Sequence, residues 1–351
     1  MPEFETADLS DDERAARARL DPGAYDFYAT GSVGEVTLRE AEQSWRAHRF
    51  LPRILRDVSA VDTGLDLLGN RLALPVLVAP TAFHSMAHPA GEAATAAGTA
   101  AAGSLFVLSS RATRPIEEVA SAAGPWWYQV YVLRDRELTR KQVERAAANG
   151  AGALVLTVDA PVVARKARRG AALPLADEDR QTGAMAPETR TPDQEQDPSI
   201  GFDTIAELTR VSGLPVLVKG VLRPDDARAC VEAGAAGVIV SNHGGRQLDR
   251  AVSAAAALPL VAAEVGGEVP VLVDGGIRSG IDVLTALALG ARAVLLGRPV
   301  LWALAAGGAD SVRDLLVERR AELAEAMTLA GARDLGEVTA DLLAPRPRPE
   351  A

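Results

Sequence analysis

The residues best suited to chemistry in this chain lie in one short segment, SNHGGRQLD, at residues 241–249. His243 is of the residue type that takes up a proton near neutral pH, and Arg246 can pair with a carboxylate through two parallel hydrogen bonds. A lone histidine is more often structural than catalytic. This one directly follows an apolar run and stands beside two glycines and an arginine, which favours catalysis. The segment therefore predicts removal of a proton from a substrate that carries a carboxylate.

Two further segments predict a phosphate site. They are DGGIR at residues 274–278 and GRP at residues 297–299. Their glycines let the backbone approach a phosphate closely, and Arg278 and Arg298 can neutralise its charge. A phosphorylated substrate or a phosphate-bearing cofactor would satisfy this pattern equally well. The alternative is that the glycines make tight turns and the arginines lie in solvent.

Lys219 ends the apolar run PVLVKG. A cation there is costly unless an anionic or electron-rich group accompanies it. His84 and His88 have the i, i+4 spacing of a metal-binding pair, but Pro89 follows them and no third ligand is evident. We therefore expect no metal site.

The elements that must position these residues are short and apolar. Most of the runs are continuously apolar, as expected for strands buried on both faces of a parallel sheet. Helical spacing in residues 91–102, 136–149, 224–233 and 280–289 indicates alternating strands and helices. The eight expected strands are residues 74–80, 104–110, 126–131, 153–159, 215–220, 237–242, 270–276 and 293–299.

Polar residues stand at the carboxyl ends of nearly all eight runs. An open doubly wound sheet would use mainly the strands at its switch point, whereas a (β/α)8 barrel builds its site around one whole rim. We therefore predict an α/β TIM barrel with an N-terminal helical segment. It would form a single domain at residues 1–351, with the barrel core at about 74–332.

One connection departs from the regular alternation of short strands and helices. A polar segment after the fourth strand, at about residues 170–202, is rich in Pro, Asp, Glu and Gln. Its composition predicts a mobile loop, which at the catalytic rim could act as a lid or be a passive linker. Residues 310–329 are typical of the last helix or helices, and the tail at 344–351 is expected to fray.

The amino-acid composition disfavours several classes of binding partner. The formal net charge is -10, which disfavours nucleic acid and anionic membranes as partners. The single cysteine, Cys230, excludes an intramolecular disulfide and suits a reducing compartment. No apolar run approaches the roughly 20 residues of a membrane span, and the charged N-terminus is unlike a signal peptide. We expect a soluble, cytoplasmic protein.

The motifs together closely resemble the FMN-dependent α-hydroxy acid oxidase and dehydrogenase family, which includes glycolate oxidase, lactate oxidase and mandelate dehydrogenase. The likeness runs in the family's order from about Tyr25 to about Ala332. It implies a TIM barrel, FMN, and oxidation of a 2-hydroxy acid to the 2-oxo acid. The motifs are YDFYATGS, FLPRILRDV, APTAFHSMAHPAGE, LSSRAT, YQVYVLRD, LTVDAP, PVLVKG, SNHGGRQLD, DGGIRSG and GRP.

The resemblance also implies roles for individual residues. His243 would act as the base, Arg246 would hold the substrate carboxylate, and Tyr131 would contact the reacting end of the substrate. Lys219 would stabilise negative charge at the N1/C2 carbonyl side of the reduced ring. Whether electrons leave the substrate as a hydride or through a carbanion stays open. The other implied cofactor contacts include Pro80, Thr81 and Ala82 beside the ring, and Ser109, Gln129 and Thr157 at its polar edge. Asp274 would bind the ribityl chain, and the phosphate would be held by Gly276, Arg278, Gly297 and Arg298. Ser241 is a further implied contact.

Three positions depart from the family pattern. Phe27 replaces a tyrosine whose hydroxyl helps to bind the carboxylate, although Tyr28 could compensate. Arg111 occupies a variable pocket position that is tryptophan in glycolate oxidase-like members. Lys166 stands where an arginine is usual, and Arg165 beside it could substitute. We expect a substrate larger or more polar than glycolate or lactate; the alternative is that Arg111 points into solvent.

The electron acceptor is the least constrained feature. Ala82, where some dehydrogenases carry glycine, favours oxygen as acceptor and hydrogen peroxide as product. The alternatives are a soluble dehydrogenase with another acceptor and a catalytically silent FMN-binding barrel, in which Phe27 and Lys166 would mark lost function. Another FMN barrel enzyme, such as a type 2 isopentenyl diphosphate isomerase, would not need His243 with Arg246. The resemblance also implies a homo-oligomer, a tetramer in many relatives.

Overall fold

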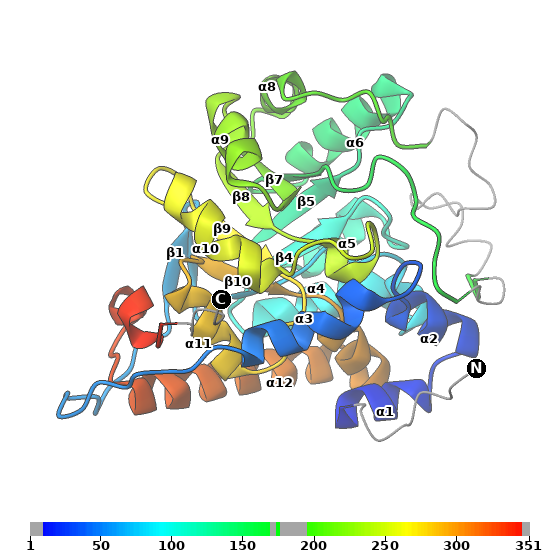
Figure 1. Cartoon of the computed structure of the whole chain (residues 1–351). Coiled ribbons are helices and arrows are strands. Elements are labelled where there is room, and N and C mark those ends of the chain that lie inside the picture. The colour runs from blue at the N-terminus through cyan, green and yellow to red at the C-terminus, as the bar shows by residue number, and fades with distance from the viewer. Residues whose placement is uncertain (1–9, 169–172, 176–194, 346–351) are drawn as a thin grey trace.

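A computed structural model describes residues 10–168, 173–175 and 195–345. Eight parallel strands close into a barrel in the order β10-β3-β4-β5-β6-β7-β8-β9. Figure 1 shows the helices arranged around the strands. The predicted (β/α)8 barrel is therefore confirmed. Seven strands lie within the runs that predicted them, and β7 ends one residue beyond its run, at Val221. The strands are β3 (Val76–Val78), β4 (Phe106–Ser109), β5 (Trp126–Val130), β6 (Leu154–Thr157), β7 (Val216–Val221), β8 (Gly237–Val240), β9 (Val271–Asp274) and β10 (Ala293–Leu296).

The strands are apolar except near their carboxyl ends, because each separates two layers of core. Alternate side chains such as Leu77, Val107 and Trp127 fill the barrel interior. The residues between them, such as Val78 and Phe106, pack outward in the larger core that includes the helices. Both faces of every strand are thus withdrawn from water, and no polar alternation is seen.

A helix follows each barrel strand and covers the outer face of the sheet. The four helical stretches predicted from the sequence are confirmed as α4, α6, α9 and α11. The helices that follow the strands are α4 (Gly91–Ala101), α5 (Ile116–Ala122), α6 (Arg136–Ala148), α8 (Asp203–Ser212), α9 (Pro224–Glu232), α10 (Ala254–Val265), α11 (Gly280–Ala288) and α12 (Arg298–Ala330).

The last helix is longer than the sequence predicted. Helix α12 begins at Arg298, directly after β10, and its backbone departs from helical geometry at Gly307 and Gly308. The prediction of residues 310–329 covers only the part beyond this break. The first part was missed because residues 300–306 are uniformly apolar and show no helical spacing of polar residues.

The N-terminal helical segment is also confirmed, as α1 (Asp11–Arg17), α2 (Pro22–Ala29) and α3 (Val36–Arg46). The Asp249 carboxylate accepts hydrogen bonds from the backbone N–H groups of Gly34 and Thr37, at 2.9 and 3.0 Å. The N–H of Ser32 donates to the carbonyl of Gly245. These bonds hold the segment between α2 and α3 against the loop after β8.

A two-stranded antiparallel hairpin, β1 (Leu65–Leu67) and β2 (Asn70–Leu72), was not predicted. Leu65, Leu67 and Leu72 belong to the interior core of the barrel, so the hairpin closes one end of it.

Most of the loop predicted at about 170–202 lies outside the described residues, since 169–172 and 176–194 are not described. Of the rest, Leu175 packs with Phe83, and Gln196 forms an isolated bridge with Leu133. Residues 346–351 of the expected tail also lie outside the description. No helix within the described ranges is long and apolar enough to cross a bilayer.

Candidate active site

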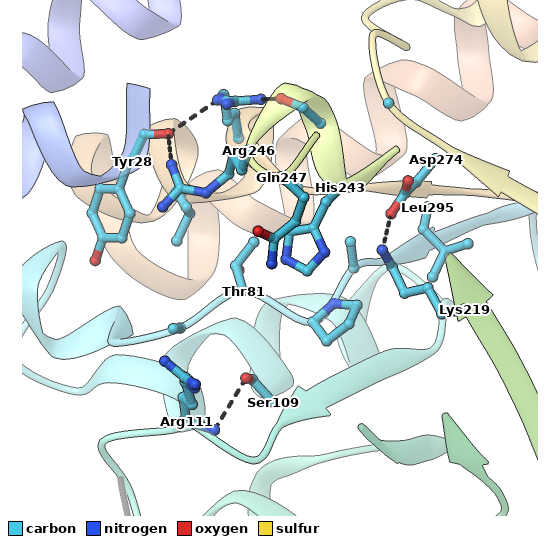
Figure 2. A pocket seen from close by; sticks show the side chains of 18 of the residues that line it. Tyr28, Thr81, Ser109, Arg111, Lys219, His243, Arg246, Gln247, Asp274 and Leu295 are labelled. Carbon is cyan, nitrogen blue, oxygen red and sulfur yellow. Dashed lines mark hydrogen bonds and ion pairs between the residues drawn. The ribbon is translucent and has the colours of Figure 1, made fainter. Parts of the chain in front are cut away.

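One cavity lies at the carboxyl ends of the barrel strands, and Figure 2 shows it from close by. Most of the residues that the sequence singled out line it. Gln129, Thr157 and Ser241 do not line it but are buried in or directly after the neighbouring strands. The lining residues predicted from the sequence are Phe27, Pro80, Thr81, Ala82, Ser109, Arg111, Tyr131, Lys166, Lys219, His243, Arg246, Asp274, Gly276, Arg278, Gly297 and Arg298.

His243 forms a pair with Asp159, which follows β6. The Nδ1 atom of His243 lies 2.9 Å from Oδ1 of Asp159. Burial opposes the charge of Asp159, but the charge of His243, its hydrogen bond and the charge of Lys219 together lower the pKa of Asp159. The carboxylate can only accept, so in the neutral form of His243 the hydrogen is on Nδ1 and the lone pair is on Nε2. Nε2 is 3.5 Å from the Tyr131 hydroxyl.

A bulge in β7 makes room for this pair. The register between β7 and β8 shifts between Lys219 and Val221, and Gly220 has a φ of +107°. A Cβ on Gly220 would lie 2.6 Å from the Cβ of Asp159, so only glycine fits there. Bulges commonly change the direction of side chains next to active sites. This bulge shifts the pairing of β7 with β8 directly after Lys219.

Lys219 has the anionic partner that its apolar setting required. Its Nζ lies 2.9 Å from Oδ2 of Asp274 and donates to the Ser241 hydroxyl at 2.8 Å. Burial opposes its charge, but Asp274 and Asp159 raise the pKa of Lys219, so the ammonium is retained. The Ser241 hydroxyl also accepts from the backbone N–H of His243 at 3.0 Å. Ser241 thus joins the lysine and the histidine.

Arg246 is anchored by the N-terminal segment. Its Nη1 donates to the carbonyls of Phe27 and Thr30, both at 2.7 Å, and to that of Tyr28 at 3.3 Å. The guanidinium also lies 5.1 Å from the centre of the Phe27 ring, within the range of a cation–π contact. Phe27 therefore contacts the arginine, although it has no hydroxyl with which to reach a carboxylate.

Tyr28 does not take over the role of the missing hydroxyl. Its own hydroxyl donates to the carbonyl of Phe83 at 2.6 Å, and the side chain is buried among the helices α2 and α12. The suggested compensation by Tyr28 is wrong, because the hydroxyl already has a backbone acceptor.

Lys166 lines the cavity, whereas Arg165 is exposed and does not. The ammonium of Lys166 donates to the carbonyl of Arg246, and an isolated bridge joins Lys166 to Ser32. Burial lowers the pKa of Lys166 to about 7, and the charges of Arg246, Arg298 and Arg111 contribute in the same direction.

Arg111 lines the cavity rather than lying in solvent. Its guanidinium carbon is 5.0 Å from the centre of the Tyr131 ring. Burial lowers the pKa of Arg111, which the nearby Tyr131 opposes. The backbone N–H of Arg111 donates to the Ser109 hydroxyl at 3.1 Å, which fixes the start of the side chain (Figure 2).

The predicted phosphate residues meet at the end of the cavity formed by the loops after β9 and β10. Arg298 begins helix α12 and donates to the carbonyls of Tyr28 and Gly244, both at 3.0 Å. Burial lowers the pKa of Arg298, and the charges of Arg246 and Arg278 lower it further. Arg278 pairs with Glu42 at 3.0 Å. A helix N-terminus beside two arginines favours an anion.

Comparison with known proteins agrees with this geometry. Residues 16–345 match the family described as FMN-dependent dehydrogenase. The chain belongs to this family. It is 42% identical to the L-lactate oxidase of Nostoc sp. over 94% of this chain and 96% of the relative, and 43% identical to the 4-hydroxymandelate oxidase of Amycolatopsis orientalis over 93% and 95%. A crystal structure of mandelate oxidase is similar with a TM-score of 0.87 at 41% identity, covering 95% of this chain and 96% of that one.

FMN is the cofactor of the FMN-dependent dehydrogenase family, and the residues present here fit it. Within the described residues, several buried polar atoms at the positions that the resemblance assigned to the cofactor have no hydrogen-bond partner in the protein. They are Nε2 of Gln129, Oγ1 of Thr157, Oδ1 of Asp274 and Nη2 of Arg298. Buried polar atoms are rarely left unpaired, so this set indicates a polar ligand with donors and acceptors along its length and an anionic end.

His84 and His88 form no metal site with other described residues. Nε2 of His84 lies 2.6 Å from the Thr81 hydroxyl, and Nδ1 lies 2.8 Å from that of Thr95. No group of three histidine, cysteine, aspartate or glutamate side chains that could hold a metal occurs in the described part of the chain. His84 instead orients Thr81 at the cavity wall.

Sequence reasoning missed two residues near this site. Asp159 ends the run 153–159, so the signal that singled out Lys219 and Asp274, a charged residue at the end of a strand, could have found it. Glu92 gave no such signal because it stands in an ordinary helical stretch. Its buried carboxylate accepts from the backbone N–H groups of His84, Thr113 and Arg114.

Proposed function

We propose that this chain oxidises a 2-hydroxy acid to the corresponding 2-oxo acid, with FMN as the group that accepts two electrons. The observation that carries the proposal is the pairing of His243 with Asp159. It directs the unprotonated Nε2 of His243 toward a cavity that Arg246 also lines. A proton acceptor and a carboxylate-binding group therefore face the same space.

Each residue has a chemical task in this proposal. Nε2 of His243 takes a proton from the substrate, and Asp159 stabilises the imidazolium that results. Arg246, held in place by three backbone carbonyls, binds the substrate carboxylate with its remaining N–H groups. Tyr131 contacts the reacting end of the substrate, 3.5 Å from His243. Lys219 keeps a positive charge beside the ring of the cofactor.

The remaining assigned residues bind FMN in this proposal. The backbone of Pro80, Thr81 and Ala82 lies along the ring, and Ser109, Gln129 and Thr157 bind its polar edge. Ser241 supports Lys219, and Asp274 binds the ribityl chain. The phosphate is held by Gly276, Arg278, Gly297 and Arg298.

We further propose oxygen as the electron acceptor, with hydrogen peroxide as product. The support is Ala82 at the cavity wall and the relatives that are named oxidases. A soluble dehydrogenase with another acceptor is the second candidate. A silent FMN-binding barrel is disfavoured because the His243–Asp159 and Lys219–Asp274 pairs are both formed.

The first test is the visible spectrum of the FMN-loaded protein, recorded without oxygen while 2-hydroxy acids are added. We expect loss of the flavin absorption with at least one acid, and rapid return of the colour with peroxide when air is admitted. Slow return would favour the dehydrogenase. Retention of colour with every acid in a broad panel would contradict the proposed function.

The matching variant is His243→Gln. We expect turnover to fall by about 10²- to 10⁴-fold, because the proton acceptor is lost. The bound FMN should remain visible, since the protein still folds and still holds its cofactor. Turnover within threefold of the wild-type value would contradict the role of His243.

Location and assembly remain predictions. We propose a cytoplasmic protein, supported by its single buried cysteine, and a homotetramer, supported only by resemblance. Cell fractionation and light scattering of the purified protein test these two points separately.

A further inference from the structure

The described residues that line the cavity carry an excess of positive charge. Asp274 is the only acidic side chain among them. Charged groups withdrawn from water are costly unless they are paired, so the balance of charge constrains what the cavity binds. The cationic lining residues are Arg111, Lys166, Lys219, Arg246, Arg278 and Arg298.

Most of these cations have an evident counterion or acceptor. Lys219 pairs with Asp274, and Arg278 pairs with Glu42. Under the proposed function, Arg298 faces the FMN phosphate and Arg246 the substrate carboxylate. A phosphate carries roughly two negative charges, which Arg278 and Arg298 share in the proposed function, and the single charge of the substrate carboxylate is held by Arg246.

Lys166 and Arg111 are left, and they differ in kind. The ammonium of Lys166 donates to the carbonyl of Arg246, and its lowered pKa of about 7 lets it shed its charge. A guanidinium cannot do so at any ordinary pH. Arg111 therefore keeps a positive charge for which neither FMN nor a single carboxylate supplies a partner.

Among the described residues, Arg111 contacts the aromatic ring of Tyr131 but no anionic group. Its guanidinium stacks on the Tyr131 ring and forms no hydrogen bond or ion pair with any described residue. Tyr131 in turn lies 3.5 Å from His243, so Arg111 is next to the place where the substrate reacts. In the view of Figure 2, Arg111 and Arg246 lie on opposite sides of the cavity, with Thr81 between them.

We propose that Arg111 binds a second carboxylate at the far end of the substrate, so that the preferred substrates are 2-hydroxy dicarboxylic acids. This inference rests on the proposed function and deepens it. The first carboxylate is held by Arg246, the hydroxyl-bearing carbon faces His243, and the second carboxylate reaches the exposed edge of the Arg111 guanidinium. The arrangement makes Arg111 a specificity-determining residue.

The test compares acids of equal chain length that differ in the second carboxylate, such as 2-hydroxyglutarate and 2-hydroxypentanoate. We expect kcat/KM to be about 10- to 100-fold higher for the dicarboxylate, as for a hydrogen-bonded charge pair in a partly desolvated site. In Arg111→Leu this ratio should fall toward one, and in Arg111→Lys part of it should remain. Arg165→Leu, which removes an exposed cation outside the cavity, should leave the ratio unchanged.

A second readout needs no turnover. Titration of the bound flavin's absorption with 2-oxoglutarate and 2-oxopentanoate gives the ratio of their Kd values. We expect a preference for the dicarboxylate that Arg111→Leu removes. This ratio still tests Arg111 if no acid reduces the flavin, in which case the proposed function fails on its own.

Two outcomes would overturn the inference. One is a wild-type ratio near one in both readouts, or a ratio that Arg111→Leu leaves intact. The other is a preference for aryl 2-hydroxy acids that disappears in Arg111→Leu, which would assign the guanidinium to an aromatic ring instead.

Discussion

Asp159 determines which nitrogen of His243 can accept a proton. Asn at this position would present an amide that can donate to Nδ1 and so favour the tautomer with hydrogen on Nε2. We therefore expect Asp159→Asn to lower kcat by about 10²- to 10⁴-fold while FMN stays bound. Steady-state turnover and the flavin spectrum measure both effects. Asp66→Asn, in the exposed hairpin, is the control, and equal kcat in both variants would contradict the role of Asp159.

Lys166 should make anion binding dependent on pH. Burial, with the charges of Arg246, Arg298 and Arg111, lowers its pKa to about 7 in the free protein, and a bound carboxylate favours its protonated form. Binding then takes up a proton above pH 7, so affinity must fall as the pH rises. We expect the Kd of a 2-oxo acid to rise by up to roughly tenfold per pH unit between pH 7 and 9.

Lys166→Arg is the informative comparison, because a guanidinium stays charged throughout this range. Its Kd should be flat where that of the wild type rises. Parallel curves for the two proteins, obtained by flavin titration, would exclude Lys166 as the titrating group.

At the scale of single residues, the sequence identified side chains better than their partners. His243, Arg246 and Lys219 are recognisable because a polar residue ends an apolar run. Their partners come from other strands or from the N-terminal segment: Asp159, the carbonyls of residues 27, 28 and 30, and Asp274. Those pairings depend on how the barrel closes, which no local pattern records.

At the scale of elements, Glu92 joins the loop after β3 to the loop after β4. Its carboxylate is fully buried in α4 and accepts from three backbone N–H groups and the Thr113 hydroxyl. A glutamine side chain has only one acceptor oxygen, and its NH₂ group would point at the remaining N–H donors and leave them without an acceptor. We expect Glu92→Gln to lower the free energy of unfolding by about 2 to 4 kcal/mol and to weaken FMN binding.

Urea unfolding of the FMN-free protein measures the first effect. The matched control is Glu117→Gln, which breaks an exposed pair with Arg145 and should cost less than about 1 kcal/mol. A loss for Glu92→Gln no larger than for the control would show that the two loops are held by other contacts.

The elements themselves were predictable in proportion to their length and apolarity. The barrel strands are continuous apolar runs bounded by polar residues, and each was found. The hairpin of β1 and β2 was missed because each strand has three residues, too few for a pattern. The first part of α12 was missed because residues 300–306 are uniformly apolar, without the polar positions that reveal a helical period.

At the scale of the whole molecule, FMN should add to the stability of the fold. A ligand that binds only the folded state at 100 times its Kd adds about 2.7 kcal/mol. Riboflavin lacks the phosphate and should raise Tm less than FMN does. In Arg298→Leu we expect this difference to shrink, because the buried guanidinium that we propose to bind the phosphate is gone. An unchanged difference in thermal unfolding would place the phosphate elsewhere.

The closure of the barrel between β3 and β10 also has a consequence for biosynthesis. Thr81 follows the first barrel strand and Arg298 follows the last, yet both line one cavity. A ribosome delivers the chain from its N-terminus at about 5 to 20 residues per second, so the two walls of the cavity emerge many seconds apart. A nascent chain that ends before Arg298 has no complete cavity for FMN. Cofactor loading in the cell therefore comes at the end of translation or after it, and the newly made barrel must survive in its empty form until FMN arrives.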